Sequence, residues 1–535
     1  MKAFFRKIFS SKILCFALLF IELLVVVIFW AFIEFGFTES VAGGLPLDQR
    51  EFIGKLLTII FYTLRGILYV INIVVFFKIV NREENPEYKI PWLVFIFILP
   101  VWTITFFLIF GKTKLRKKDV KIVEPTKKLL EDRAKIHEEE NQAVLSEIDE
   151  EYQGVFNYLR WATKLDITKN NRITYYKNGE EFFPDMVEAL KTAKKFIFIE
   201  FFIVARGKWW DKIHEVLVQK AKEGVEVRLI YDDIGSSKVV PTNFDLHLQK
   251  EGIGCHKFHP VMPTMSNAVN NRDHRKIVVI DHKIGFTGGM NLADEYANDL
   301  PRFGYWKDTM VKVEGKAISN LIATFLQNYD LTTFKLSDYE KYVLGDYDTF
   351  DDKGYAFHFG DAPGGYQNFE QIGEQNYINL LNVAKKKVYI STPYLIATYP
   401  LTRALQAAAK RGVEVHLIVP GIPDKKMVYT MAKCSFHTFL EAGIHVHIYT
   451  PGFNHEKQML VDDRLCFVGT INFDFRSLTH HFETGITFLD APCLPQIKED
   501  FEDMLKQSEE VPVDFKAKLG QRLLFAIVKM IRVLF

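Results

Sequence analysis

Three long apolar stretches dominate the beginning of the chain. They cover residues 13–33, 56–80 and 90–110 and contain no more than two charged residues each. A bilayer core about 30 Å thick is crossed by roughly 20 apolar residues in a helix, so each stretch is long enough. A signal peptide has a shorter apolar run, and we expect no cleavage because two more stretches follow the first. The pattern predicts an N-terminal membrane anchor over residues 1–118.

The orientation of this anchor stays open. If all three stretches cross, equal numbers of basic residues flank them on the two sides, and the positive-inside rule does not choose. The basic run "KTKLRKK" at 112–118 favours a cytoplasmic location for the rest of the chain. In that case the N-terminus lies outside, or one stretch, the first with Glu22 or the second with Arg65, does not cross fully. These two charges could also pair inside the membrane.

A change of pattern follows the anchor. Residues 119–165 are rich in charge and predict a helical linker with a solvated face and no site chemistry. From about residue 166 the pattern alternates between strand and helix. "KFIFIEFFIV" at 195–204 predicts a strand, 210–224 a helix, and "VEVRLIYDD" at 225–233 a second strand. This order predicts βαβ units and a largely parallel sheet.

The pattern then repeats. "AKKFIFIEFFI" at 193–203 returns as "AKKKVYISTPY" at 384–394, and further blocks follow in the same order. Such a repeat indicates an internal duplication. We therefore predict an α/β fold with two similar lobes, 166–345 and 346–510, whose mixed, largely parallel sheets are flanked by helices. A pseudo-twofold arrangement would bring equivalent elements of the lobes face to face.

One short motif occurs once in each predicted lobe. "HRKIVVID" at 274–281 and "HEKQMLVD" at 455–462 share His-x-Lys-x-x-x-x-Asp. Glycine and asparagine follow both copies at the same spacing, which ends at Asn291 and Asn472. Histidine and lysine two residues apart project from one face of a strand. Two convergent His-Lys pairs would form a positive pocket that suits a phosphate diester.

The chemistry of phosphoryl transfer gives these residues roles. One neutral imidazole, of His274 or His455, would attack phosphorus to form a phosphohistidine, and the other would protonate the leaving alkoxide. Lys276 and Lys457 would hold the non-bridging oxygens, with Asn291 and Asn472 as amide donors.

Carboxylates would orient the two imidazoles. We predict Glu483, in "HHFETG", for His455, and Asp308, in "YWKDT", for His274. The motif aspartates, Asp281 and Asp462, are included with the catalytic residues. Their place five residues past the lysine favours bracing of a turn.

Composition excludes several other classes. The formal net charge of +1 argues against a generally basic nucleic-acid binder, although it leaves room for a local basic patch. The five cysteines are scattered without metal spacing and suggest a reducing compartment. His480 and His481 lack the cysteines or clustered carboxylates of a metal site, so we expect no metal and no other cofactor.

The chain resembles the phospholipase D superfamily, and its bacterial cardiolipin synthase branch in particular. The resemblance is carried by "DHRKIVVIDHKIGFTGGMNLADEY" (273–296), "YWKDT" (305–309), "STPYL" (391–395), "PGIPDKK" (420–426), "HEKQMLVDDRLCFVGTINFDFRS" (455–477) and "HFETG" (481–485). Glu456 and Gln458 depart from the small or hydroxyl residues usual inside the second motif.

The resemblance implies a metal-independent phosphatidyl transfer in the bacterial plasma membrane. One phosphatidylglycerol would donate its phosphatidyl group and release glycerol, and a second would accept the group to give cardiolipin. The sequence does not order the histidines, although the resemblance favours His274 as the nucleophile. The competing functions are a phospholipase D-type hydrolase or phosphodiesterase, and a membrane-tethered lipid or nucleic-acid binder with a dead site.

The C-terminal residues 511–535 predict an amphipathic helix. Basic residues including Lys518 and Arg522 fall on one helical face, and leucines including Leu519 and Leu523 fall on the opposite face. Such a helix suits the surface of an anionic membrane. The alternative is a terminal helix packed on the catalytic lobes.

Overall fold

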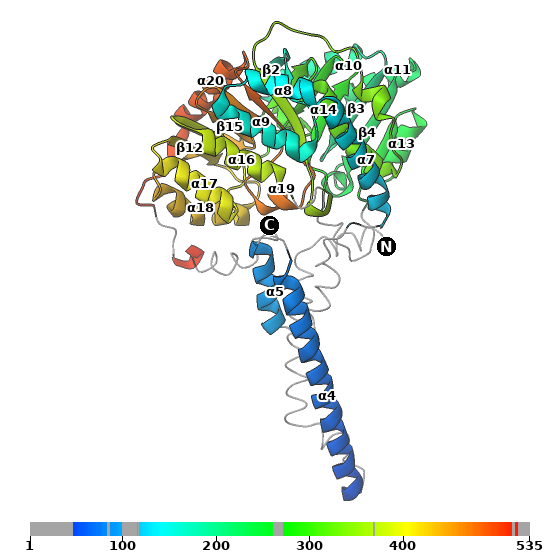
Figure 1. Cartoon of the computed structure of the whole chain (residues 1–535), viewed down its shortest axis with the longest axis vertical. Coiled ribbons are helices and arrows are strands. Elements are labelled where there is room, and N and C mark those ends of the chain that lie inside the picture. Colours follow the sequence, from blue (N-terminus) through cyan, green and yellow to red (C-terminus); the bar gives the residue numbers. More distant parts are fainter. Residues whose placement is uncertain are drawn as a thin grey trace. The chain divides into compact units, whose positions relative to one another are not determined.

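The structure is a computed structural model (Figure 1). It describes residues 46–82, 86–98, 115, 117–260, 271–366, 370–515 and 519–522. The chain divides into two compact units, of which the first comprises residues 1–113 and 261–269 and the second comprises 114–260 and 270–535.

Two helices make up the described part of the first unit. Helix α4 (Leu47–Val80) and helix α5 (Pro86–Ile98) pack together through Val75, Ile79 and Ile96. The predicted stretch 56–80 lies inside α4. Within the described residues, no helix combines the length and the apolar character that a membrane span requires. Stretch 13–33 and residues 99–110 lie outside the described residues, so the membrane anchor stays a prediction.

The second unit begins with three helices that cover residues 117–163. They are α7 (Lys117–Ile136), α8 (Glu138–Glu147) and α9 (Glu150–Thr163). The inner faces of these helices are apolar, and Leu130 and Phe156 are buried in the main core. The sequence suggested a solvated linker, and its outer face is polar. The segment nevertheless packs on the catalytic lobes, because its apolar residues recur at helical spacing.

The first lobe contains a seven-stranded sheet. Its strand order is β2-β9-β7-β6-β3-β4-β5. The strands are β2 (Arg172–Tyr176), β3 (Phe196–Phe201), β4 (Glu226–Asp232), β5 (Gly254–Phe258), β6 (Lys276–Ile280), β7 (Ile284–Gly288) and β9 (Met310–Glu314). The helices are α10 (Gly179–Lys191), α11 (Lys208–Lys222), α12 (Asp233–Ser236), α13 (Phe244–Lys250), α14 (Ile318–Thr333) and α15 (Tyr339–Val343).

The second lobe contains a nine-stranded sheet in the order β1-β10-β17-β16-β15-β11-β12-β13-β18. The strands are β1 (Thr168–Lys169), β10 (Tyr355–Asp361), β11 (Lys387–Ser391), β12 (Glu414–Pro420), β13 (His445–Tyr449), β15 (Gln458–Val461), β16 (Leu465–Gly469), β17 (Glu483–Leu489) and β18 (Ser508–Glu510). The helices are α16 (Ile372–Val383), α17 (Tyr399–Lys410), α18 (Lys426–Leu440), α19 (Phe475–Thr479) and α20 (Leu494–Lys506).

The two sheets repeat one topology. In the first, β3, β4 and β5 are parallel, and β6, β7, β9 and β2 add antiparallel neighbours. In the second, β11, β12 and β13 are parallel, and β15, β16, β17 and β10 add the antiparallel neighbours. The α/β class with mixed sheets is confirmed. The expectation of largely parallel sheets is wrong, because most strand pairs among the described residues are antiparallel.

The antiparallel pairs come from hairpins at the end of each motif. Strands β6 and β7 are joined at Asp281, and β15 and β16 are joined at Asp462. Both aspartates have positive φ, at 52° and 51°, a conformation that aspartate tolerates better than most residues. The sequence showed the βαβ units clearly and favoured a turn at these aspartates, but it did not show that the turn pairs the flanking strands in antiparallel hairpins.

The motif aspartates brace these hairpins. The Asp281 carboxylate accepts hydrogen bonds from the backbone N–H groups of Lys194, Lys195 and Phe196 at 2.8–2.9 Å. Asp462 accepts three from residues 385–387 at 2.8 Å. Both aspartates lie at the far ends of strands whose near ends carry the histidines. The bracing role describes these contacts, and a catalytic role for either aspartate stays a prediction.

The two lobes share one hydrophobic core. Ile277 of β6, Phe325 of α14, Phe359 of β10 and Phe467 of β16 belong to the same buried cluster. A second cluster lies under α10 and α11 and includes Phe182. Figure 1 shows the strands of both lobes within one continuous body. Close packing of this kind gives the elements that carry the motifs little freedom to separate.

Replacing Asp281 with alanine should destabilise the protein by roughly 1–3 kcal/mol, because three backbone N–H groups, including that of the buried Phe196, lose their acceptor. Thermal unfolding of the detergent-solubilised chain measures this effect. Glu188→Ala is the control, since it removes an exposed carboxylate that pairs only at the surface with Lys191. Equal unfolding midpoints for the two variants would contradict the bracing role.

Candidate active site

The lobes exchange backbone hydrogen bonds beside each histidine. Strand β8 (Tyr305–Lys307) of the first lobe pairs in parallel with β14 (Gly452–Asn454) of the second. On the other side, Asp273 forms a bridge with Phe482. Each histidine directly follows one of these contacts. The start of each motif is therefore held by the opposite lobe.

These backbone contacts set a crossed arrangement of carboxylates. His274 Nδ1 lies 2.8 Å from Glu483 Oε2 of the second lobe. His455 Nδ1 lies 2.6 Å from Asp308 Oδ2 of the first lobe. The sequence-based pairing, Glu483 with His455 and Asp308 with His274, is therefore wrong, although all four residues belong to the site.

The reason for the crossing lies in the backbone register. The His274 N–H donates to the Phe482 carbonyl at 2.8 Å, which places the neighbouring Glu483 against the ring. The His455 N–H donates to the Lys307 carbonyl at 2.7 Å, which places Asp308 in the same way. Contacts between segments far apart in sequence leave no signal in a single chain, so the pairing could not be deduced.

The motif lysines lie beneath the histidines and are fully buried. Lys276 Nζ donates to the His274 carbonyl at 2.6 Å. Lys457 Nζ contacts the His455 carbonyl and lies 2.8 Å from His455 Nδ1. Burial lowers the pKa of Lys276 to about 7 and that of Lys457 to about 8. An anionic substrate would favour the charged form of both ammonium groups.

Both histidines are kept neutral. Burial, followed by the charges of Lys276 and Lys457, holds the pKa of His274 well below its ordinary value. Burial and Lys457 lower the pKa of His455 to about 4, whereas Asp308 acts in the opposite direction. Each lysine acts on the histidine of the other lobe as well as on its own. The two His-Lys pairs therefore share one electrostatic environment.

The predicted asparagines occupy different environments. Asn291 Nδ2 donates to the Tyr296 hydroxyl at 2.6 Å, and its Oδ1 accepts from the Ile203 N–H at 3.0 Å. Asn472 is buried, and its Oδ1 has no hydrogen-bond partner among the described residues. The amide nitrogen and oxygen of Asn291 therefore both form hydrogen bonds with other protein groups. A role as amide donor to a substrate remains a prediction for both.

The glycine-rich end of each motif makes room for the carboxylates. A Cβ at Gly289 would lie 2.0 Å from Asp308 Oδ1, so only glycine lets this carboxylate approach. In the second lobe Thr470 follows Gly469, and its hydroxyl donates to Glu483. The first copy thus has Gly289 where Asp308 approaches the motif, and the second copy has Thr470 where Glu483 approaches it.

Aromatic rings surround the two histidines unequally. His455 contacts Tyr296, Trp306 and Phe453, with ring centroids 5.3–5.6 Å away. His274 contacts Phe202 at 5.2 Å and His481 at 5.6 Å.

His481 is a site residue that sequence reasoning missed. Its Nδ1 lies 3.4 Å from Glu483 Oε1, and burial lowers its pKa to about 3. Its place two residues before Glu483 was the available signal. Potential ligand atoms of His274, His481 and Glu483 lie within 4.8 Å of one another, as a metal site would require. In the chemistry predicted from the motifs, however, Glu483 accepts a hydrogen bond from His274 and does not act as a metal ligand.

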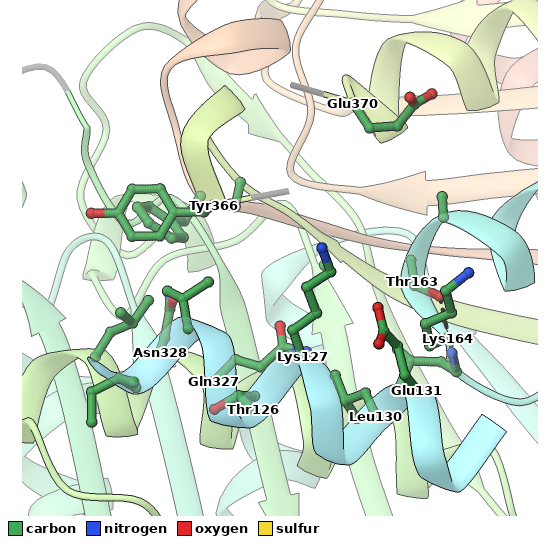
Figure 2. Close-up of a pocket in the computed structure, with 18 of the residues that line it drawn as sticks. Thr126, Lys127, Leu130, Glu131, Thr163, Lys164, Gln327, Asn328, Tyr366 and Glu370 are labelled. Carbon is green, nitrogen blue, oxygen red and sulfur yellow. Dashed lines mark hydrogen bonds between the residues drawn. The ribbon is translucent and has the colours of Figure 1, made fainter. Parts of the chain in front are cut away.

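A separate cavity of about 290 Å³ lies behind the motifs. Its lining includes Lys127 and Glu131 of α7, Asn328 of α14, and Arg275 and Phe482. Figure 2 shows Lys127 extending from α7 toward the space between Tyr366 and Glu370. No predicted catalytic side chain lines this cavity, so it is not the phosphate site.

Two duplicated α/β lobes that bring paired His-x-Lys motifs together define the phospholipase D-like class of proteins. Residues 186–328 and 377–505 match the family model "Cardiolipin synthase, PLD-like domain". Residues 70–112 match the model "Phospholipase D-nuclease N-terminal". The chain belongs to the phospholipase D-like cardiolipin synthase family.

Individual relatives agree with this membership. The chain is 39% identical to an uncharacterized protein of Streptococcus mutans over 85% of this chain and 98% of that protein. It is 31% identical to cardiolipin synthase 2 of Bacillus anthracis, over 86% of this chain and 89% of that one. Phosphatidylserine synthase of Haemophilus influenzae has a similar fold, with a TM-score of 0.55 and 15% identity, over 72% of this chain and 100% of that one.

The buried histidines predict a pH-dependent difference in stability between the wild type and His455→Asn. The unfolded chain protonates His455 below its ordinary pKa of about 6.5, whereas the folded protein does so only near 4. The wild type should therefore lose stability relative to the variant as pH falls from 6.5 toward 4. The loss should reach about 1.4 kcal/mol per pH unit.

Thermal unfolding of both proteins between pH 4 and 7 measures this difference, because titrating groups that do not interact with His455 contribute equally to both. His437→Asn, at an exposed surface pair with Glu441, is the control and should follow the wild type. A His455→Asn difference that does not change with pH would contradict the lowered pKa.

Proposed function

We propose that this protein is a cardiolipin synthase that transfers a phosphatidyl group between two phosphatidylglycerol molecules through a phosphohistidine. The observation that carries the proposal is the crossed arrangement of His274 with Glu483 and of His455 with Asp308. It provides two oriented imidazoles above two lysines, and a two-step displacement at phosphorus needs one of them as nucleophile and the other as acid and base.

In the first step His274 acts as the nucleophile. Glu483 accepts the Nδ1–H, so the lone pair at Nε2 is available to attack phosphorus. The bond from phosphorus to the glycerol oxygen breaks as the bond to Nε2 forms, and protonated His455 gives its proton to that oxygen. Lys276 and Lys457 stabilise the charge on the non-bridging oxygens. Glycerol leaves, and the phosphatidyl group remains on His274.

In the second step the neutral His455 accepts a proton from a hydroxyl of another phosphatidylglycerol. The oxygen of this hydroxyl attacks phosphorus, and the bond to His274 Nε2 breaks. Cardiolipin is formed, and His455 is protonated again. No metal or other cofactor takes part in this sequence, since the protein supplies both the nucleophile and the acid.

Electrostatics support this order of the two histidines. Burial and the charges of Lys276 and Lys457 hold the pKa of His274 well below its ordinary value, as suits a nucleophile that must stay neutral. His455 has the shorter bond to its carboxylate, and that carboxylate favours the imidazolium. Binding of a phosphate anion would raise the lowered pKa of His455 and so favour its protonated form. Opposite roles thus follow from unequal surroundings, as in other acid–base pairs.

A bacterial plasma membrane location, with the catalytic lobes in the cytoplasm, accompanies this activity. Large apolar side chains of α4, including Phe52, Ile59 and Tyr69, are more than half exposed. Exposed apolar surface of this extent favours contact with lipid. We propose a multi-pass anchor over residues 1–118 that raises the local concentration of lipid substrate at the site. Anionic membrane lipids are the expected partners, and nucleic acid is not.

A phospholipase D-type hydrolase is the second candidate. The same histidines serve both reactions, and water would replace the second lipid hydroxyl. The choice depends on the exclusion of water from the phosphohistidine. The family membership favours transfer.

Purified protein in phosphatidylglycerol vesicles should produce cardiolipin and glycerol, separated by thin-layer chromatography. His274→Ala should lower the rate by at least about 1000-fold, because the nucleophile is lost. The matched control His437→Ala removes a surface histidine and should keep the wild-type rate. A metal chelator should leave the rate unchanged.

Two results would decide against parts of this account. Phosphatidic acid as the main lipid product would establish the hydrolase instead of the synthase. Undiminished cardiolipin production by His274→Ala would exclude the phosphohistidine.

Deleting residues 514–535 should weaken binding to anionic liposomes, because the predicted amphipathic helix would be lost. The described part of this segment is limited to residues 514–515 and 519–522, so the helix is argued from its sequence. Co-sedimentation with phosphatidylglycerol vesicles measures the effect, and neutral vesicles are the control. Equal co-sedimentation of the full and shortened chains would favour a helix packed on the catalytic lobes.

A further inference from the structure

The residue between histidine and lysine differs between the two motifs. Arg275 occupies this position in the first motif and Glu456 in the second, and both are buried. Arg275 donates hydrogen bonds to the carbonyls of Glu483, Thr324 and Asp361 at 2.9–3.1 Å. The Arg275 guanidinium thus links, through hydrogen bonds, three backbone segments that lie next to the residue after His274. Glutamate cannot donate such bonds, so the His455 half of the site needs another means of support.

A buried lysine of the opposite lobe supplies this support. Lys307 Nζ lies 2.9 Å from Glu456 Oε1 and 2.6 Å from Asp500 Oδ2. It also donates to the Lys177 carbonyl at 2.5 Å. The Tyr175 hydroxyl donates to the same oxygen of Asp500 at 2.6 Å. One cation from the first lobe is therefore held between two carboxylates from the second.

The ammonium of this cluster stays charged. Burial acts to lower the pKa of Lys307, but Glu456 and Asp500 more than compensate and raise it above its ordinary value. The Lys307 side chain is 6% exposed, and that of Glu456 is 0% exposed. A buried ion pair of this kind is costly to break, because the partner that remains is buried and uncompensated.

The ion pair lies in register with the catalytic hydrogen bond. Lys307 directly precedes Asp308, and Glu456 directly follows His455. Between the two pairs, the His455 N–H donates to the Lys307 carbonyl. A shift of Lys307 would therefore move Asp308 away from the imidazole. Displacements of about 1 Å at a catalytic group are enough to cost roughly 100-fold in rate.

We propose that Lys307, Glu456 and Asp500 form a positioning cluster that holds Asp308 against His455 for protonation of the leaving alkoxide. This inference rests on the proposed function, in which His455 is the acid. None of the three residues is expected to touch the substrate. Their role is specific to the His455 half of the site, because Arg275 serves the His274 half.

The test compares two substrates that differ in their need for an acid. Glycerol leaves phosphatidylglycerol only with a proton, whereas p-nitrophenolate leaves a phosphatidyl ester of p-nitrophenol without one. Glu456→Gln should lower the rate with phosphatidylglycerol by about tenfold or more. The burst of p-nitrophenolate, which reports formation of the phosphohistidine on His274, should stay within about twofold of the wild type.

Asp500→Asn should show the same pattern, and Glu456→Asp, which keeps the carboxylate, should restore part of the rate. Glu414→Gln is the matched control, at a half-exposed carboxylate of the second lobe that pairs with Lys387. Parallel loss of both rates in Glu456→Gln would indicate a general structural role and overturn the proposal, and so would an unchanged rate with phosphatidylglycerol.

The identity of the wild-type product tests the proposed function separately. Cardiolipin supports the synthase, and phosphatidic acid supports the hydrolase. Both reactions release glycerol in the first step, so the comparison of substrates tests the positioning cluster in either case.

Discussion

The site depends on the two hydrogen bonds that join each catalytic imidazole to a carboxylate of the opposite lobe. Glu483 reaches His274 and Asp308 reaches His455, so neither lobe contains a complete half-site. Backbone bonds beside each pair fix the distance between the lobes at these points. The shared hydrophobic core then keeps the lobes together. Folding of both copies is thus a condition for catalysis, and a single lobe would carry an unoriented histidine.

Burial gives the site its chemical character. Two lysines and two histidines lie together with little exposure, and burial lowers the pKa of all four. Such a cluster would be unfavourable without Asp308 and Glu483, whose charges favour the cationic forms. A phosphate diester would supply the missing negative charge. Binding of such an anion would therefore relieve the unfavourable burial of the cationic groups, and the same groups would stabilise the charged transition state.

Much of this architecture could be predicted from the sequence, and the parts that could not share one cause. The duplication, the α/β class and the two motifs were visible because they repeat or alternate along the chain. A turn at Asp281 and Asp462 was expected from their place in the motif, but the antiparallel hairpins were missed because no glycine marks these turns as hairpin turns. The crossed partners of His274 and His455 were missed because each contact joins residues far apart in the chain. The separation is 209 positions for His274 and Glu483, and 147 positions for His455 and Asp308. Local patterns predict elements, whereas side-chain partners across a lobe interface require the register of both lobes.

The differences between the two copies explain how a symmetric scaffold supports an asymmetric reaction. Identical half-sites would give two histidines of equal basicity, and neither would be assigned to attack or to protonate. Here Arg275 ties backbone carbonyls around His274, whereas Glu456 forms an ion pair with Lys307 beside His455. Aromatic rings enclose His455, and a second histidine, His481, faces His274. Because the two motifs share a pattern but not these neighbours, the neighbours give the imidazoles unequal surroundings, and the proposed mechanism uses this inequality to assign one as nucleophile and the other as proton carrier.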